Sequence, residues 1–275
     1  MTELQPQTGF LDIQGAPLYY EVAGTGHPLL LIHAGITDSR MWDEQLQSFA
    51  QQYRVIRYDI RGYGKSTIPA GKFANHEDVT ALFEHLGIKL AHVIGISFGG
   101  LIALDFTLAH PDQVTSLVLG APDVSGSESS SADVSRFAEE EEALLERGDL
   151  NSATNLNLRM WLDVPRRTPD QVDPTVRQRI YEMQYHAFTV PIPAEAEVIS
   201  LEPPAITRLS EIHVPTLFIV GEYDIPEKIE LVGQLVTEIP NARQIVISDA
   251  AHIVNMEQPA EFNRVVLDFL AHIPN

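Results

Sequence analysis

Cysteine is absent from the 275 residues of the chain. Disulfide bonds, thiolate metal ligands and a cysteine nucleophile are therefore excluded, and packing has to stabilise the fold. Basic residues are also scarce: 18 lysines and arginines stand against 38 acidic residues, for a formal net charge of −20. Such a charge repels phosphate groups, so the sequence predicts neither nucleic-acid binding nor attachment to an anionic membrane.

Long apolar runs are missing as well. The longest, such as Pro28 to Ile32 and Pro215 to Val220, are far too short to span a bilayer. The N-terminal segment MTELQPQTGF has no basic stretch followed by an apolar one, so no signal peptide is predicted. These absences lead us to expect a cytoplasmic protein.

What the sequence does contain is an alternation of short apolar strands with amphipathic helices. It is clearest where a predicted strand over 92–96 is followed by a predicted helix over 98–109. Alternation of this kind is typical of an α/β protein with a mostly parallel sheet and right-handed crossovers.

The alternation stops after Pro122 and resumes near residue 211. Residues 123–133, DVSGSESSSAD, have the composition of a polar linker, and helical spacing continues from there to about residue 210. We therefore predict a core formed by 1–122 and 211–275, with an inserted helical cap over 123–210.

The segment Gly95-Ile96-Ser97-Phe98-Gly99 fits G-x-S-x-G between a predicted strand and a predicted helix. That context is the one a nucleophile elbow requires, because the sharp turn exposes the serine hydroxyl and leaves no room for neighbouring side chains. A glycine-rich turn with an incidental serine is the simpler alternative. The strand–turn–helix context favours the elbow, with Ser97 as the nucleophile.

A serine hydroxyl needs a base, and a histidine base needs a carboxylate to orient it. His252 follows the last predicted strand, and Asp224 follows the strand before it, so both loops reach the sheet edge that carries Ser97. The chain order Ser97, Asp224, His252 is the order of α/β hydrolases. Glu222 and Asp123 are rival carboxylates. Histidines elsewhere, including His92, are interpreted as surface or helix-end residues.

An oxyanion hole requires two backbone amides near the nucleophile. The amide of Phe98, directly after Ser97, is the first candidate. The second is expected after the predicted strand 29–33, where we choose Gly35, with Ile36 as the nearest alternative. His33 is expected to brace this loop.

With these residues in place, the chain resembles an α/β-hydrolase-fold serine hydrolase over nearly its whole length. The segments that carry the resemblance are His33-Ala34-Gly35, Asp59 to Ser66, Gly95 to Gly100, Val214 to Leu217, Gly221 to Asp224, and His252. The resemblance implies an eight-stranded sheet with antiparallel first strands, a cap after the sixth strand, and neither cofactor nor metal. The family often has His-Gly where this chain has His33-Ala34, and that departure leaves the second oxyanion donor open.

Substrate choice is expected to depend on the cap. Ile36, Trp161, Tyr185 and His186 are predicted to contact the substrate. The motif from His33 to Asp38 resembles the lactone-hydrolysing branch, which includes enol-lactone and acyl-homoserine-lactone hydrolases. By analogy, the expected partner is a small ester or lactone, acted on by a monomer or homodimer.

Other activities remain open. A C–C bond hydrolase or a cofactor-free perhydrolase would use nearly the same three residues. An aminopeptidase would hold an amine with cap carboxylates, for which Glu139–Glu142 is the candidate, although such a run more often forms a solvated helix face. A haloalkane dehalogenase is disfavoured because position 97 is not aspartate. A non-catalytic receptor on this scaffold is the alternative of another class.

Overall fold

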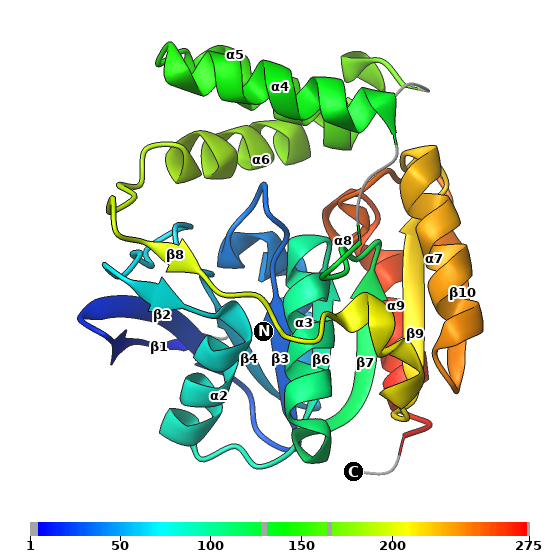
Figure 1. The fold of residues 1–275 in the computed structure, drawn as a ribbon. Coiled ribbons are helices and arrows are strands. Elements are labelled where there is room, and N and C mark those ends of the chain that lie inside the picture. The colour runs from blue at the N-terminus through cyan, green and yellow to red at the C-terminus, as the bar shows by residue number, and fades with distance from the viewer. Residues whose placement is uncertain (1–4, 128–130, 164–166, 274–275) are drawn as a thin grey trace.

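The computed structural model describes residues 5–127, 131–163 and 167–273. A central twisted sheet has helices on both faces, and further helices lie across the ends of its strands (Figure 1). The predicted α/β fold with a mostly parallel eight-stranded sheet is confirmed. The predicted linker 123–133 falls partly outside the described residues.

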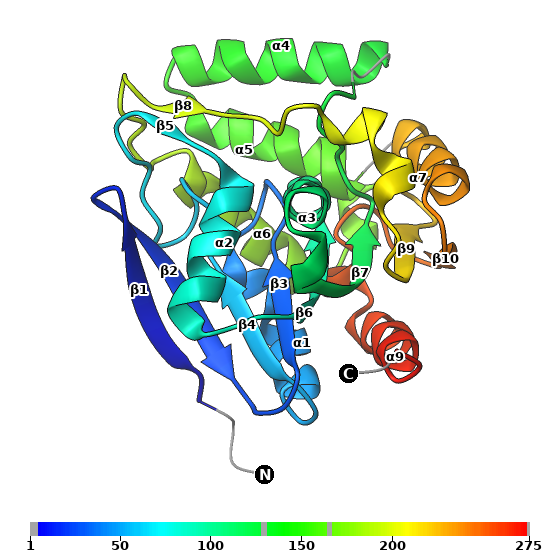
Figure 2. The same ribbon diagram turned by 60° about the horizontal axis from the view of Figure 1, so that its bottom comes forward.

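The main sheet has the order β1-β2-β4-β3-β6-β7-β9-β10. β1 and β2 form an antiparallel hairpin, β2 pairs antiparallel with β4, and the other neighbours are parallel. Figure 2 shows β1 and β2 at one edge of the sheet and β10 at the other. The strands are β1 (Gln7–Ile13), β2 (Ala16–Ala23), β3 (Pro28–Ile32), β4 (Arg54–Tyr58), β6 (Ala91–Ile96), β7 (Val114–Gly120), β9 (Thr216–Gly221) and β10 (Ala242–Ile247).

A second, two-stranded sheet pairs β5 (Lys72–Phe73) with β8 (Glu197–Val198). The α-helices are α1 (Asp43–Phe49), α2 (Asn75–Leu86), α3 (Phe98–Ala109), α4 (Ala132–Glu146), α5 (Leu150–Leu158), α6 (Pro174–Ala187), α7 (Pro226–Glu238), α8 (Val254–Glu257) and α9 (Pro259–Leu270). In the described chain, no helix is long and apolar enough to cross a membrane.

Side-chain alternation along the strands divides the core into two layers. In β3, Leu29 and Leu31 pack into the layer covered by α1 and α9. Leu30 and Ile32 point the other way, into the layer covered by α2, α3 and α7. All four side chains are fully buried, as expected for a parallel strand between two helical layers.

The inserted segment divides between the two parts of the molecule. Helices α4, α5 and α6, called here the cap helices, lie over the carboxyl ends of the parallel strands (Figure 1). Ala205 and Leu209 instead pack against the core layer that contains α3. The chain therefore returns to the core before residue 211, where the sequence predicted the cap to end.

The structure corrects the interpretation of His92 as a surface or helix-end residue. It lies in β6, is fully buried, and its Nδ1 is 2.8 Å from the Ser116 hydroxyl. The interpretation as a surface residue was wrong because a central parallel strand is covered on both faces.

Three glycines let α3 cross close to the sheet. A methyl group on Gly95 would collide with the Gly99 carbonyl oxygen, and one on Gly99 would collide with the carbonyl oxygens of Ile32 and His33. A methyl group on Gly100 would come within 2.6 Å of Pro122 Cβ. The glycine spacing therefore fixes how β6 turns into α3.

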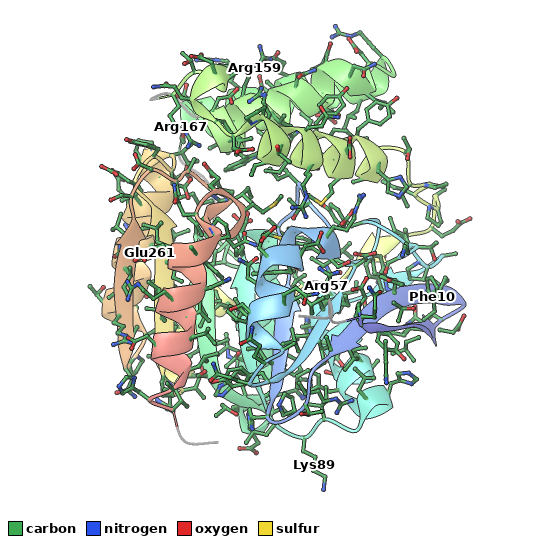
Figure 3. All side chains as sticks on the ribbon, turned by 180° about the vertical axis from the view of Figure 1, so that it is seen from behind. Phe10, Arg57, Lys89, Arg159, Arg167 and Glu261 are labelled. Carbon is green, nitrogen blue, oxygen red and sulfur yellow. The ribbon has the colours of Figure 1, made fainter. Side chains whose placement is uncertain are left out.

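Arg167, labelled in Figure 3, connects the cap segment to Glu257 in α8 and to Tyr223, which follows β9. Its guanidinium is 2.5 Å from a Glu257 carboxylate oxygen and lies 5.6 Å from the centroid of the Tyr223 ring. The other Glu257 oxygen accepts the Ala251 N–H at 3.0 Å. Burial raises the pKa of Glu257, and the Arg167 charge opposes that shift.

Gly99→Ala is expected to lower the free energy of unfolding by about 1–3 kcal/mol, because backbone atoms cannot move aside as a flexible side chain would. Urea denaturation measures this loss. Gly233→Ala is the control, because Gly233 is exposed in α7 with nothing within 4 Å of an added methyl group. It should gain about 0.5–1 kcal/mol. Equal stability of both variants would contradict the close crossing.

Arg167→Ala is expected to cost about 3 kcal/mol near neutral pH, because it leaves the Glu257 carboxylate buried without its cation. The pKa of Glu257 is already raised in the folded protein and should rise further. The deficit therefore grows as pH rises through the folded pKa of Glu257, and it is lost as pH falls to the unfolded pKa, where this carboxyl is protonated with or without Arg167.

Denaturation at about pH 8 and about pH 5 measures this dependence. Adding Glu257→Gln to the Arg167→Ala variant should recover most of the loss, because no charge is then stranded. A loss of stability that stays constant with pH and persists in the double variant would contradict a stabilising role of the Arg167–Glu257 ion pair.

Candidate active site

Ser97 sits at the turn between β6 and α3 with φ 54° and ψ −117°. A positive φ in a residue other than glycine is strained and persists only where the surroundings enforce it. Here the Ser97 N–H donates to Gly120 O at 2.8 Å, and the Ser97 carbonyl accepts from the N–H groups of Gly100 and Asp123. The predicted elbow geometry is thus present, and Ser97 as a residue is 9% exposed.

His252 and Asp224 meet at the carboxyl edge of the sheet. His252 Nδ1 is 2.9 Å from Asp224 Oδ2 and 3.1 Å from Oδ1, and both residues are 1% exposed. Because a carboxylate only accepts hydrogen bonds, Nδ1 carries the proton and Nε2 is left as an acceptor. Within the described residues, this buried Nε2 has no hydrogen-bond partner. Of the rival carboxylates, Glu222 instead accepts the Asp249 N–H at 3.4 Å.

The second rival, Asp123, lies beside the serine. The Ser97 hydroxyl donates to Asp123 Oδ2 at 3.4 Å, a long hydrogen bond. The other Asp123 oxygen is paired with the buried ammonium of Lys228 on α7. The serine hydroxyl is therefore turned toward Asp123 in this structure, and catalytic hydrogen bonds often tighten only when substrate is bound.

One cavity of about 240 Å³ brings these groups together. Ser97, Asp123 and His252 line one side of it, and residues of the cap helices line the other. The other lining residues are Gly35, Ile36, Tyr63, Phe98, Glu141, Asn157, Trp161, Gln184 and Phe188. The Trp161 ring lies 4.7 Å from the His252 ring, between centroids.

The predicted oxyanion residues are adjacent. A methyl group on Gly35 would lie 3.5 Å from Phe98 Cβ, and both residues line the cavity with Ser97. His33 supports this loop: its Nδ1 is 2.9 Å from Ala34 O, and its Nε2 accepts the Ile60 N–H at 2.9 Å. Burial lowers the pKa of His33, which keeps the ring neutral in this bracing role.

The predicted substrate contacts divide into two groups. Ile36 and Trp161 lie in the cavity wall, whereas Tyr185 and His186 do not. Tyr185 stacks on Tyr181, with ring centroids 6.1 Å apart, and His186 Nε2 lies 2.8 Å from Gly64 O at the surface. Gln184 on α6 and Phe188, one turn later and just past the end of this helix, line the cavity, so Tyr185 and His186 face away from this wall.

Three further polar residues line the cavity, of which the sequence interpretation missed Asn157 and Gln184 and named Glu141 only within the acidic run Glu139–Glu142. Glu141, Asn157 and Gln184 come from α4, α5 and α6, so each cap helix supplies one. Asn157 Nδ2 donates to Glu141 Oε1. Burial raises the pKa of Glu141, against the effect of this hydrogen bond. Its neighbours Glu139, Glu140 and Glu142 are exposed. The helical period predicts that these four side chains point in different directions, but which of them faces the cavity depends on tertiary packing.

Tyr63 completes the polar part of the wall. Burial, and then the nearby Glu141 charge, raise the pKa of its hydroxyl to about 12. It therefore stays protonated and able to donate at neutral pH. Among the described residues, there is no group of three histidine or acidic side chains that could hold a metal ion.

Comparisons with known proteins agree with this geometry. The family model of the alpha/beta hydrolase fold matches residues 27–259. A 3-oxoadipate enol-lactonase of Acinetobacter baylyi is 26% identical over 94% of this chain and 95% of its own length. The carboxylesterase YbfK of Bacillus subtilis is 25% identical over 88% of this chain and 79% of its own length.

A solved structure described as Est816, an N-acyl homoserine lactone degrading enzyme, superimposes with a TM-score of 0.74. It is 26% identical and covers 95% of this chain and 100% of the solved chain. These relatives agree with the expected esterase and lactonase type of enzyme. The match to the family model extends over most of the sequence, and the chain belongs to the alpha/beta hydrolase fold family.

Proposed function

We propose that this protein is a serine hydrolase that cleaves small carboxylic esters or lactones through an acyl-enzyme. The observation that carries the proposal is a histidine with one free ring nitrogen in the same cavity as a strained serine. His252 Nε2 is buried without a partner in the described structure, its Nδ1 is held by Asp224, and Ser97 lines the same cavity.

In the first step, the Ser97 side chain rotates from Asp123 toward His252. Its oxygen attacks the substrate carbonyl while Nε2 takes the hydroxyl proton, and Asp224 stabilises the imidazolium that results. The amides of Phe98 and Gly35 stabilise the negative oxygen of the tetrahedral intermediate. The C–O bond to the leaving group then breaks, and the imidazolium protonates the alkoxide.

The second step repeats the sequence with water. His252 removes a proton from water, the resulting hydroxide attacks the acyl carbonyl, and Ser97 leaves with the proton returned by the imidazolium. A lactone differs only in that the alkoxide stays covalently attached to the acyl group. C–C hydrolysis and perhydrolysis would use the same residues. The relatives named enol-lactonase and carboxylesterase favour ester and lactone bonds.

The scale of the cavity supports a small-molecule substrate. About 240 Å³ is below the usual range for drug-sized ligands, so a short acyl chain or a small ring fits it best. Ile36, Trp161 and Phe188 provide its apolar wall. We expect the acyl group to lie against these side chains. Monomeric or homodimeric assembly and a cytoplasmic location remain predictions from the sequence.

Ser97→Ala is expected to lower kcat/KM for p-nitrophenyl butanoate by about 10⁴-fold or more, since the nucleophile is lost. The rate is measured from the absorbance of released p-nitrophenolate at about 400 nm. Ser135→Ala, on the exposed side of α4, is the control and should keep the parental rate. Substantial turnover by Ser97→Ala would contradict the assignment.

Asp224→Asn is expected to lower kcat by about 10⁴-fold, because an amide at this position favours the wrong histidine tautomer. Glu222→Gln, two residues away and exposed, should stay within about twofold of the parent, as is usual for surface substitutions. Asp123→Asn should cost less than Asp224→Asn. A larger loss in Glu222→Gln or Asp123→Asn would move the carboxylate role to that residue.

A further inference from the structure

The cavity above Ser97 contains a carboxylate with no cation beside it. Glu141 lines the wall, and neither lysine nor arginine is present among the described lining residues. Lys228 lies nearby but is paired with Asp123 and points its ammonium to that residue and to the Pro122 carbonyl. Burying a charge is costly unless it is paired, so Glu141 is an unusual residue for an ester-binding wall.

A second acceptor lies in the same wall. Gln184 is 4% exposed, and its Oε1 is buried without a hydrogen-bond partner in the described structure. Asn157, which donates to Glu141, also donates to Ala153 O, so both hydrogens of its amide are used. Glu141 and Gln184 of the cap therefore present acceptor oxygens to the cavity, and the donor hydrogens of Asn157 are engaged.

On this basis we propose that the cap selects substrates that carry a protonated amine, bound by Glu141 and Gln184. The inference rests on the function proposed above, because the amine would be a substituent of the ester or lactone. An ammonium group has three donors and no acceptor, which suits a carboxylate and an amide oxygen. Its charge replaces the cation that the cavity lacks.

The charge of the whole molecule acts in the same direction. With a formal net charge of −20, the protein attracts cationic solutes and repels anionic ones. All acidic residues contribute to this long-range field, whereas the proposed selection of cationic substrates depends mainly on the side chain of Glu141. A test therefore has to separate the two effects.

Two pairs of p-nitrophenyl esters provide the probe: 3-aminopropanoate with butanoate, and 6-aminohexanoate with heptanoate. Within each pair an ammonium replaces a methyl group, so size is nearly constant. The ratio of kcat/KM values, cationic over neutral, is the readout. We expect a ratio above one in at least one pair, and Glu141→Gln should lower it by about 10- to 100-fold, the usual effect of losing a hydrogen bond between charged groups.

Glu140→Gln is the matched control, because it changes the net charge equally. The Glu140 side chain is 53% exposed and pairs with Arg159 outside the cavity. It should keep the parental ratio. Gln184→Leu should lower the ratio without changing the charge.

The outcomes separate this inference from the proposed function. Turnover of the neutral esters with equal ratios in the parent and Glu141→Gln would overturn the amine site alone. Equal loss of the ratio in Glu140→Gln would assign the preference to the overall field and also overturn it. Failure of the parent to cleave any of the four esters, or turnover that Ser97→Ala does not lower, would instead count against the proposed function itself.

Discussion

The close crossing of β6 and α3 is the constraint on which the rest of the site depends. Gly95 and Gly99 let the backbone turn sharply, and the turn forces Ser97 to a φ of 54°. Strain of this kind costs of order 1–3 kcal/mol and has to be offset by the surrounding packing. It places a hydroxyl at the end of a central strand, at the N-terminus of α3 and in the wall of the cavity.

The other groups of the site are held by short polar links rather than by the sheet alone. Asp224 fixes the ring of His252, and His33 joins the loop of Gly35 to the end of β4. Arg167 and Glu257 connect the cap segment to the loop that carries His252. Each link crosses between elements far apart in the sequence, so cap, core and histidine loop are coupled.

The fold and the three central residues were accessible from the sequence because their signals are local. A glycine pattern around Ser97 and strand ends before Asp224 and His252 need only short-range periodicity and the rule that parallel strands end at one edge. His92 was misinterpreted because its burial depends on two covering layers. Tyr185 and His186 were misplaced because the sequence predicts that α6 is a helix but does not predict which of its faces turns toward the cavity.

The same limit explains why Glu141 was not singled out within its acidic run. Four consecutive glutamates look alike in sequence, and only the packing of α4 on α5 turns one of them toward the cavity. Asn157 and Gln184 had no motif at all. The proposed specificity therefore depends on helix packing in the cap, whereas the proposed chemistry depends on local motifs in the core.

The central claim is that Ser97 is the nucleophile, and covalent labelling tests it most directly. The protein would be treated with a fluorophosphonate, and mass spectrometry would then give the mass of the intact chain and the modified peptide. The account predicts a single adduct on Ser97, with loss of esterase activity in proportion to labelling. An unlabelled protein, or inactivation through an adduct on a different residue, would contradict it.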